Sequence, residues 1–315
     1  MWTIMYAAAG RTRYGRHLWK KIKAHWALYL FLLPAIVYYA VFRYYPMYGI
    51  QIAFRNYKAV KGIAGSDWVG FQNFNYFFSA ADFGKLMRNT LSVSIFTLLL
   101  SFPLPIVLAL LLNQLPSARY KKIVQTTVYA PHFISTVVMV GMIFLFLSPS
   151  SGIINKLIES LGGTRVHFMA EPGAFVPIYV LSEIWQSTGW GSILYLAALT
   201  NISPELHEAA LVDGANKFQR VWHIDIPGIM PTIVIMLILS AGKVMNVGFE
   251  KDYLMQTSLN ISASEIISTY VYKRGVLKSQ FSLSTAVGLF ESVINLTLLV
   301  TVNWISRRIS DSSLF

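Results

Sequence analysis

Long apolar runs separated by polar stretches dominate this chain of 315 residues. A bilayer core about 30 Å thick is crossed by a helix of about 20 residues, because each residue rises about 1.5 Å. Several runs reach that length, and they cover approximately residues 24–45, 89–112, 124–147, 174–199, 228–247 and 282–305. The pattern therefore predicts an all-α integral membrane protein with six transmembrane helices.

Composition agrees with a membrane protein, since 55% of the residues are hydrophobic and only 13% are charged. The chain has no cysteine, which excludes a disulfide, a thiolate metal site and a cysteine nucleophile. The net charge of +12 is compatible with a nucleic-acid partner, but a cluster of basic residues directly before the first apolar run favours the lipid bilayer instead. This cluster consists of Arg11, Arg13, Arg16, Lys20, Lys21 and Lys23.

The basic cluster also predicts the orientation of the chain. Cytoplasmic segments are enriched in Lys and Arg, so we expect residues 1–23 to form a basic cytoplasmic tail. The first apolar run is too long for a cleaved signal peptide and predicts an uncleaved span. Residues 24–307 then form the membrane domain, and 308–315 form a short cytoplasmic tail. Because the loops placed outside also carry many basic residues, the orientation depends mainly on the first span and on the loop 113–122.

The longest polar break in the C-terminal half, residues 203–231, has the pattern of a structured loop. Ser203 suits an N-cap, Pro204 the first helical position and Glu205 the first turn, so a helix is expected to begin there. Gly214 can close it in the left-handed conformation. A second short helix is predicted from Asn216 to about Trp222. The chain then leads directly into the fifth span, as a coupling element requires.

This loop could lie on the lipid headgroups or in a groove of a partner protein. An amphipathic helix on the lipid headgroups normally carries Lys and Arg on its polar face. The loop is instead mostly acidic on that face, with Glu205, Glu208, Asp213 and Asp225 against Lys217 and Arg220. An acidic surface favours a basic groove of a partner protein.

Residues of this loop carry a resemblance to a known family. Glu208-Ala209-Ala210, Gly214, Ile224 and Ile226-Pro227 reproduce the EAA motif at its full spacing. The chain therefore resembles the permease subunits of binding-protein-dependent ABC importers; its one departure is Ile226, where those proteins usually have Leu.

Other segments resemble the carbohydrate branch of that family. Residues 68–74 look like its Gly-Phe-x-Asn segment, and Asn89-Thr90-Leu91 like the start of its core. Residues 44–49 and 267–272 are similar to permeases for oligo- and polysaccharides, among them those of alginate importers.

The resemblance implies a type I ABC importer permease fold with cytoplasmic coupling helices, in a bacterial cytoplasmic (inner) membrane. It also implies a second homologous permease subunit, two ATPase subunits that bind ATP and Mg, and an extracytoplasmic sugar-binding protein. An oligo- or polysaccharide would cross by alternating access. The residues that this resemblance assigns to ATPase coupling are Glu208, Ala209, Ala210, Asp213, Gly214, Ile224 and Pro227.

The chain has no phosphate-binding loop of the Gly-x-x-x-x-Gly-Lys-Ser/Thr type, so we expect a non-catalytic subunit whose ATPase is another polypeptide. The sequence His207-Glu208-Ala209-Ala210 resembles the beginning of a zinc-protease helix. That motif needs a second His at position 211, which is Leu211. No cofactor or metal site is predicted for the chain itself.

Ionisable side chains within spans are costly and therefore mark candidate functional residues. Glu183, Lys243 and Glu291 are predicted in the fourth, fifth and sixth spans, at similar depths in the outer half of the membrane. They either form a structural ion pair, with Lys243 bound to Glu183 or Glu291, or line a polar sugar path. In the second case Lys243 would meet the carboxylates of an acidic cargo.

Aromatic side chains supply further candidates. Trp185 and Trp190 in the fourth span could stack on pyranose rings, although the abundance of aromatic residues favours a packing or interface role for each. His132 beside Pro131 has no second ligand at helical spacing, so it is interpreted as a core or path residue rather than a metal ligand.

Two other classes of protein remain as alternatives. A secondary transporter driven by an ion gradient would favour an inverted internal repeat, and no convincing repeat relates the two halves. An intramembrane enzyme would need paired carboxylates, a Ser/His pair or a zinc motif, and none stands out in the predicted spans.

Overall fold

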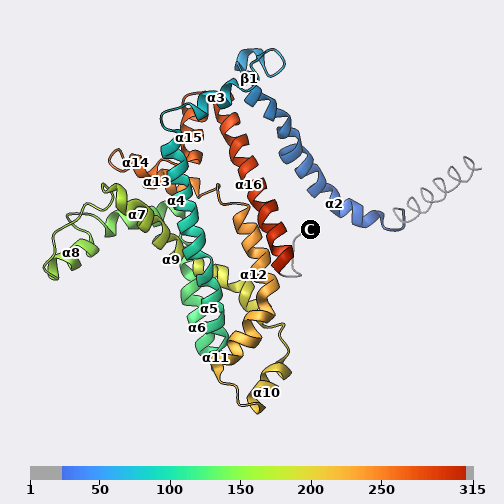
Figure 1. The fold of residues 1–315 in the computed structure, drawn as a ribbon, viewed down its shortest axis with the longest axis vertical. Coiled ribbons are helices and arrows are strands. Elements are labelled where there is room, and N and C mark those ends of the chain that lie inside the picture. The colour runs from blue at the N-terminus through green and yellow to red at the C-terminus, as the bar shows by residue number, and fades with distance from the viewer. Residues whose placement is uncertain (1–22, 310–315) are drawn as a thin grey trace, which may run out of the picture.

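The computed structural model describes residues 23–309, and helices account for most of them. The basic residues 11–21 and the segment 310–315, on which the predicted tails depend, lie outside that range. Helices run along the long axis of the molecule (Figure 1). Those of more than ten residues are α2 (Trp26–Tyr39), α4 (Phe83–Ser101), α5 (Pro103–Asn113), α6 (Ala118–Tyr129), α7 (Thr136–Phe146), α9 (Pro172–Leu199), α12 (Ile226–Ala241) and α16 (Phe281–Ile309).

The first span is longer than its apolar run suggested. It covers Trp26–Phe54, 29 residues, because α2 continues through a π-helical turn (Ala40–Tyr44) and a 3-10 helix (Tyr45–Phe54). No residue of α2 is buried, and this helix slants away from the bundle, whereas the 3-10 helix packs on α16 (Figure 1). The apolar surface of α2 is therefore available to lipid or to another subunit.

Short elements gather at the two ends of the bundle. At one end lie a two-stranded sheet, β1 (Arg55–Asn56) with β2 (Asp67–Trp68), and helices α3 (Gln72–Phe78) and α15 (Ile267–Tyr272). At the other lie α10 (Pro204–Val212) and α11 (Lys217–Arg220) (Figure 1). The remaining short α-helices of the described residues are α8 (Ile153–Ser160), α13 (Phe249–Met255) and α14 (Ile261–Ser264).

Two of the predicted spans need correction. The third is not straight: Ala118–Phe133 and Thr136–Phe146 meet at 95°. The break follows Pro131, and Ser135 caps the new helix by accepting a hydrogen bond from the Val138 amide at 3.4 Å. The fifth ends at Ala241, and turns replace the helix expected up to residue 247.

Within residues 23–309, four helices are long and apolar enough to cross a membrane, or five if the bent pair is one span. They are Trp26–Phe54, Phe83–Asn113, Lys217–Ala241 and Phe281–Arg308. The 28-residue α9 is also long enough, but polar residues such as Glu183 and Gln186 lower its hydropathy. The structure is an all-helical membrane fold in which this more polar helix packs against α4, α5, α6 and α12.

Polar side chains and one glycine hold the bundle together. Asn89 in α4 donates to the Ser262 and Glu265 carbonyls at 3.0 and 3.1 Å, and the Thr90 hydroxyl accepts from the Ile267 amide at 3.0 Å. A Cβ on Gly189 of α9 would lie 1.9 Å from the Val128 carbonyl oxygen of α6. Only glycine permits that approach.

Candidate functional site: a coupling unit joined to a polar cavity

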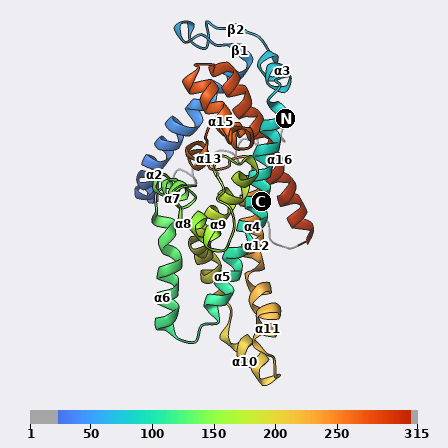
Figure 2. The ribbon, with the colours of Figure 1, turned by 90° about the vertical axis from the view of Figure 1, so that its left-hand side faces the viewer.

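Residues 203–225, here called the coupling unit, form the end of the molecule that carries α10 (Figure 2). Helix α10 begins at Pro204, as predicted, although the Ser203 side chain makes no capping hydrogen bond. It ends before Gly214, whose φ of +79° is the left-handed conformation expected there. Asn216 then caps α11, accepting from the Gln219 amide at 2.9 Å while the Gln219 side chain accepts from the Asn216 amide at 2.8 Å.

The second helix of the unit is not a separate element, which corrects the sequence-based expectation of a short helix ending near Trp222. Helix α11 continues through a π-helical turn, Val221–Asp225, into α12, so that Lys217–Ala241 is one helix of 25 residues. Both Ile224 and Pro227 lie within it. At about 1.5 Å per residue it is about 37 Å long. Residues 217–225 of the coupling unit and α12 thus belong to one unbroken helix.

The surface of the coupling unit is apolar as well as acidic. Glu208, Ala209 and Asp213 are exposed. Beside them Val212 is 89% exposed, and the stacked rings of Phe218 and Trp222 are 73% and 59% exposed. Large apolar side chains gathered on a protruding unit mark a contact surface for another protein or for the membrane.

A buried carboxylate lies where the coupling unit meets the bundle. Asp225 is fully buried. One oxygen accepts a hydrogen bond from the Gln114 side chain, which follows α5, at 3.1 Å. The other lies 3.3 Å from Nε2 of His207 in α10. Because the sequence placed Asp225 on the acidic surface of the loop, its burial was missed.

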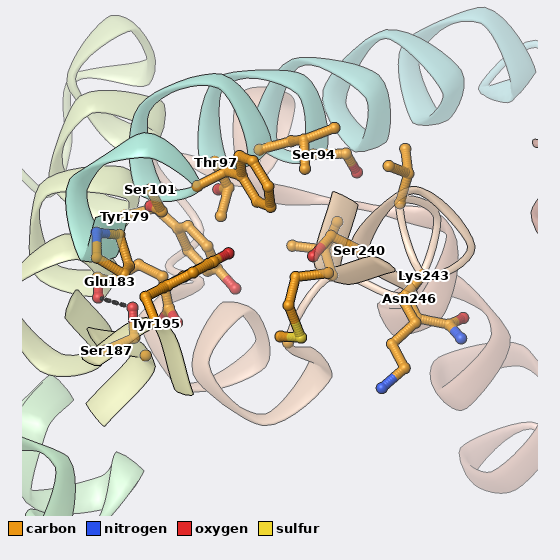
Figure 3. Close-up of a pocket in the computed structure, with 18 residues that line it drawn as sticks. Ser94, Thr97, Ser101, Tyr179, Glu183, Ser187, Tyr195, Ser240, Lys243 and Asn246 are labelled. Atoms are coloured by element: carbon orange, nitrogen blue, oxygen red, sulfur yellow. Dashed lines mark hydrogen bonds between the residues drawn. The ribbon is translucent and has the colours of Figure 1, made fainter. Parts of the chain in front are cut away.

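Helices α4, α9 and α12, together with the start of α5 and the turns after α12, enclose a cavity of about 380 Å³ (Figure 3). That volume is within the range of small-molecule sites. Three hydroxyls of α4, those of Ser94, Thr97 and Ser101, line it and have no hydrogen-bond partner among the described residues. Their spacing of three and four residues places them on one face of the helix. Ser240, near the end of α12, faces the same cavity.

The charges around the cavity match neither expectation from the sequence, which were an ion pair of Lys243 with Glu183 or Glu291, or a sugar path lined by all three residues. Glu183 binds Lys251 of α13, whose Nζ lies 2.9 Å from the carboxylate and 4.6 Å from the Tyr179 ring centre. Lys251 is only 4% exposed. Lys243 lies in the turn after α12, on the opposite side of the cavity from Glu183, so the expected pair between them is wrong (Figure 3).

Lys243 therefore has a distinct environment. It is exposed and lines the cavity, and its side chain forms no hydrogen bond or ion pair within residues 23–309. Among the ionisable residues lining the cavity, Glu183 is neutralised by Lys251 and Lys243 is the uncompensated cation. The cavity thus combines a row of hydroxyls with a positive charge.

Other candidate residues lie elsewhere. Glu291 is 9% exposed and does not line the cavity; its Oε1 is buried without a hydrogen-bond partner in the described part of the chain, so the expected contact with Lys243 is absent. Trp185 and Trp190 are 49% and 46% exposed and also lie outside the cavity lining. Trp190 stacks on His132, with ring centres 4.4 Å apart.

Sequence reasoning missed two features of this cavity. The hydroxyls of Ser94, Thr97 and Ser101 follow a helical spacing inside an apolar run, which is a readable signal. No comparable signal in the sequence marks Lys251, because it lies in a charged stretch of a predicted outer loop. Residues 23–309 contain no group of three His, Cys, Asp or Glu side chains placed to bind a metal ion.

Comparisons with known proteins identify the family. Residues 101–311 match the model of the binding-protein-dependent transport system inner membrane component. Protein LplB of Bacillus subtilis is 46% identical over 91% of both chains. The polygalacturonan/rhamnogalacturonan transport system permease protein YteP of the same organism is 42% identical, over 91% of this chain and 90% of its own.

Solved structures agree with these relatives. A chain of a bacterial ABC transporter involved in the import of the acidic polysaccharide alginate superposes with a TM-score of 0.86 at 41% identity, over 93% of this chain and 99% of that one. A second structure, of the bacterial alginate ABC transporter in complex with its alginate pentasaccharide-bound periplasmic protein, gives a TM-score of 0.87. These matches set aside the two alternatives, an ion-driven transporter and an intramembrane enzyme. The chain belongs to the family of binding-protein-dependent transport system inner membrane components, as a non-catalytic permease subunit of a bacterial ABC importer.

Proposed function

We propose that this chain forms half of the transmembrane path of an importer for acidic oligo- or polysaccharides, and that separate ATPase subunits drive it through the coupling unit. The observation that carries the proposal is the unbroken helix Lys217–Ala241. Its first turn belongs to a protruding unit with exposed apolar and acidic side chains, and its last turn contributes Ser240 to a polar cavity. Force applied at one end therefore reaches the other.

In this proposal the chain has six spans of the type I importer fold. The bent pair of α6 and α7 is the third, and α9 is the fourth, shielded from lipid in part by the helices around it. The N-terminus and the coupling unit face the cytoplasm, where the ATPase subunits bind ATP and Mg. A second homologous permease completes the path, and a sugar-binding protein delivers cargo to the opposite end.

The cavity supports an acidic cargo. Hydroxyl groups suit the hydroxyls of a saccharide, and Lys243 supplies a cation for its carboxylates. Among similar proteins, one solved relative imports alginate, named as an acidic polysaccharide, and another relative is named for polygalacturonan and rhamnogalacturonan. A second copy of such a cavity across the path would extend the site along a sugar chain.

Coupling is tested by Gly214→Val in the complete importer, reconstituted in liposomes. The φ of +79° at Gly214 strains any β-branched residue, so the bend changes and we expect at least about a fivefold loss of sugar imported per ATP hydrolysed, about 1 kcal/mol of coupling. Gly162→Val is the matched control, because Gly162 has a φ of +84° in a loop remote from α10. Normal coupling in Gly214→Val would overturn the proposal.

Cargo charge is tested by Lys243→Gln, with Lys243→Arg as the variant that keeps the cation. Lys243→Gln should reduce import of an acidic oligosaccharide about tenfold, the effect of losing about 1.4 kcal/mol of interaction, while import of a neutral oligomer of equal length changes little. Uptake of labelled sugars into proteoliposomes measures both. Equal effects on the two sugars would remove Lys243 from a role in charge recognition.

A further inference from the structure

Asp225 lies at a junction of three elements that are distant in the sequence. His207 belongs to α10, Asp225 to the turn between α11 and α12, and Gln114 follows α5. The Asp225 carboxylate contacts both neighbours, at 3.3 Å to His207 Nε2 and 3.1 Å from the Gln114 amide nitrogen. The carboxylate is fully buried. Its Oδ2 accepts the Gln114 hydrogen bond, whereas Oδ1 accepts none within residues 23–309 and has His207 as an ion-pair neighbour when the imidazole is protonated.

From this geometry we infer that Asp225 is a positioning residue that ties the coupling helix α10 to the end of α5 as well as to α12. The inference rests on the proposed coupling to an ATPase and adds to it that two spans, Phe83–Asn113 and Lys217–Ala241, follow the coupling unit together. The covalent connection alone would move only the second of these.

The energetic argument concerns the cost of breaking the junction. A buried carboxylate that loses a partner is left partly uncompensated, which is strongly unfavourable. The side chains that can place positive charge near Asp225 are Arg220, on the same helix, and His207 when its imidazole carries a proton. Sliding α10 or α5 away from Asp225 would remove the His207 contact or the Gln114 hydrogen bond from the carboxylate. Movement of all three elements as one body avoids that cost.

The junction also explains the partial burial of His207. Its side chain is 26% exposed, although it lies on a helix whose neighbours Leu206 and Glu208 are exposed. The imidazole points back towards the bundle, away from the surface offered to a partner. His207 therefore serves the internal connection of α10, and Glu208 is free for contact with another subunit.

The test uses the complete importer in liposomes, with Asp225→Asn, His207→Leu and Gln114→Leu, singly and in pairs. Arg119→Gln, an exposed cytoplasmic-end substitution away from the junction, is the control. We expect at least about a threefold loss of sugar imported per ATP for each single variant, or about 0.7 kcal/mol of coupling. The pair Asp225→Asn with His207→Leu should be little worse than Asp225→Asn alone, because both remove one interaction.

Two readouts separate positioning from general destabilisation. His207→Gln keeps a donor that can reach the carboxylate, so it should restore most of the coupling lost in His207→Leu. Spin labels on cysteines introduced at the exposed positions Val212 and Leu111 should show a narrow distance distribution in the parent importer that broadens in the His207→Leu variant.

Each outcome decides the inference. Additive losses in the double variant, or an unchanged distance distribution in His207→Leu, would overturn it. The distance measurement does not use Asp225→Asn, so it decides the inference even if that variant fails to assemble. If Gly214→Val uncouples the importer while the Asp225, His207 and Gln114 variants stay coupled, only this inference fails. If Gly214→Val stays coupled as well as the Asp225, His207 and Gln114 variants, both this inference and the proposed function fail.

Discussion

Lys251 and Asp252 are adjacent residues of α13 whose charges are buried in different ways. Lys251 is paired, because its ammonium binds Glu183 and lies over the Tyr179 ring. Asp252 has no cation in contact. Its Oδ2 accepts from the Gln256 amide at 2.9 Å, while its Oδ1 is buried without a partner in the described structure. Burial therefore raises the pKa of Asp252 to about 8.

This raised pKa predicts a pH-dependent stability. The folded state binds the proton of Asp252 more tightly than the unfolded state does, so its contribution is complete below the unfolded pKa near 4 and is lost as the pH rises to about 8. Thermal unfolding in detergent should show falling stability between these limits, by on the order of a few kcal/mol.

Asp252→Asn should flatten that dependence, because asparagine stays neutral at every pH. Asp67→Asn is the matched control, since Asp67 is exposed in β2. An identical pH profile in the parent and in Asp252→Asn would show that Asp252 is ionised in the folded protein.

At the scale of elements, packing of α9 organises the bundle. It touches α4, α5, α6 and α12, and glycine at position 189 lets the backbone of α6 approach. The same helix brings Glu183 to the cavity. The position of this candidate side chain thus depends on a packing contact about two turns away along the same helix.

Gly189→Ala tests this packing. Alanine normally stabilises a helix relative to glycine by roughly 0.5–1 kcal/mol, and Gly141→Ala in α7, where nothing lies within 4 Å of the added Cβ, should show that gain. Gly189→Ala should instead destabilise by about 1–3 kcal/mol, because α6 must move away. Thermal unfolding of the two variants in detergent measures the difference, and equal melting temperatures would contradict the packing argument.

For the whole molecule, the two ends differ in shape and in chemistry. One end carries the β1–β2 hairpin, with Val60 in its connection fully exposed, and the other carries α10, with Val212 89% exposed. In the proposed orientation these ends lie on opposite sides of the membrane. Their separation by the spans makes orientation a measurable property.

Since the chain has no cysteine, single cysteines at the two positions report this directly. In cells whose cytoplasmic membrane is intact and whose outer layers admit the reagent, a membrane-impermeant maleimide should label Val60→Cys and leave Val212→Cys unlabelled. In inverted membrane vesicles from which the ATPase subunits, whose binding would cover Val212, have been removed, the pattern should reverse. Labelling of both positions from one side would refute the six-span arrangement.

The sequence predicted elements whose local signals are strong. Pro204 and Gly214 delimit α10 because their backbone preferences are intrinsic, and apolar length located most of the spans. It did not predict the partner of Glu183, because Lys251 reaches it only through the packing of α13 beside α9. The end of α12 at Ala241 was also missed, since the apolar run continues beyond the helix.

The unbroken helix Lys217–Ala241 has a consequence for the scale of movement. From Asp225 to Ser240 it measures about 22 Å at about 1.5 Å per residue. If Asp225 acts as a pivot, a tilt of about 10° displaces Ser240 by about 4 Å, which follows from the same length. A small rotation at the coupling-unit end thus displaces this wall of the cavity relative to α9 by more than the width of a water molecule.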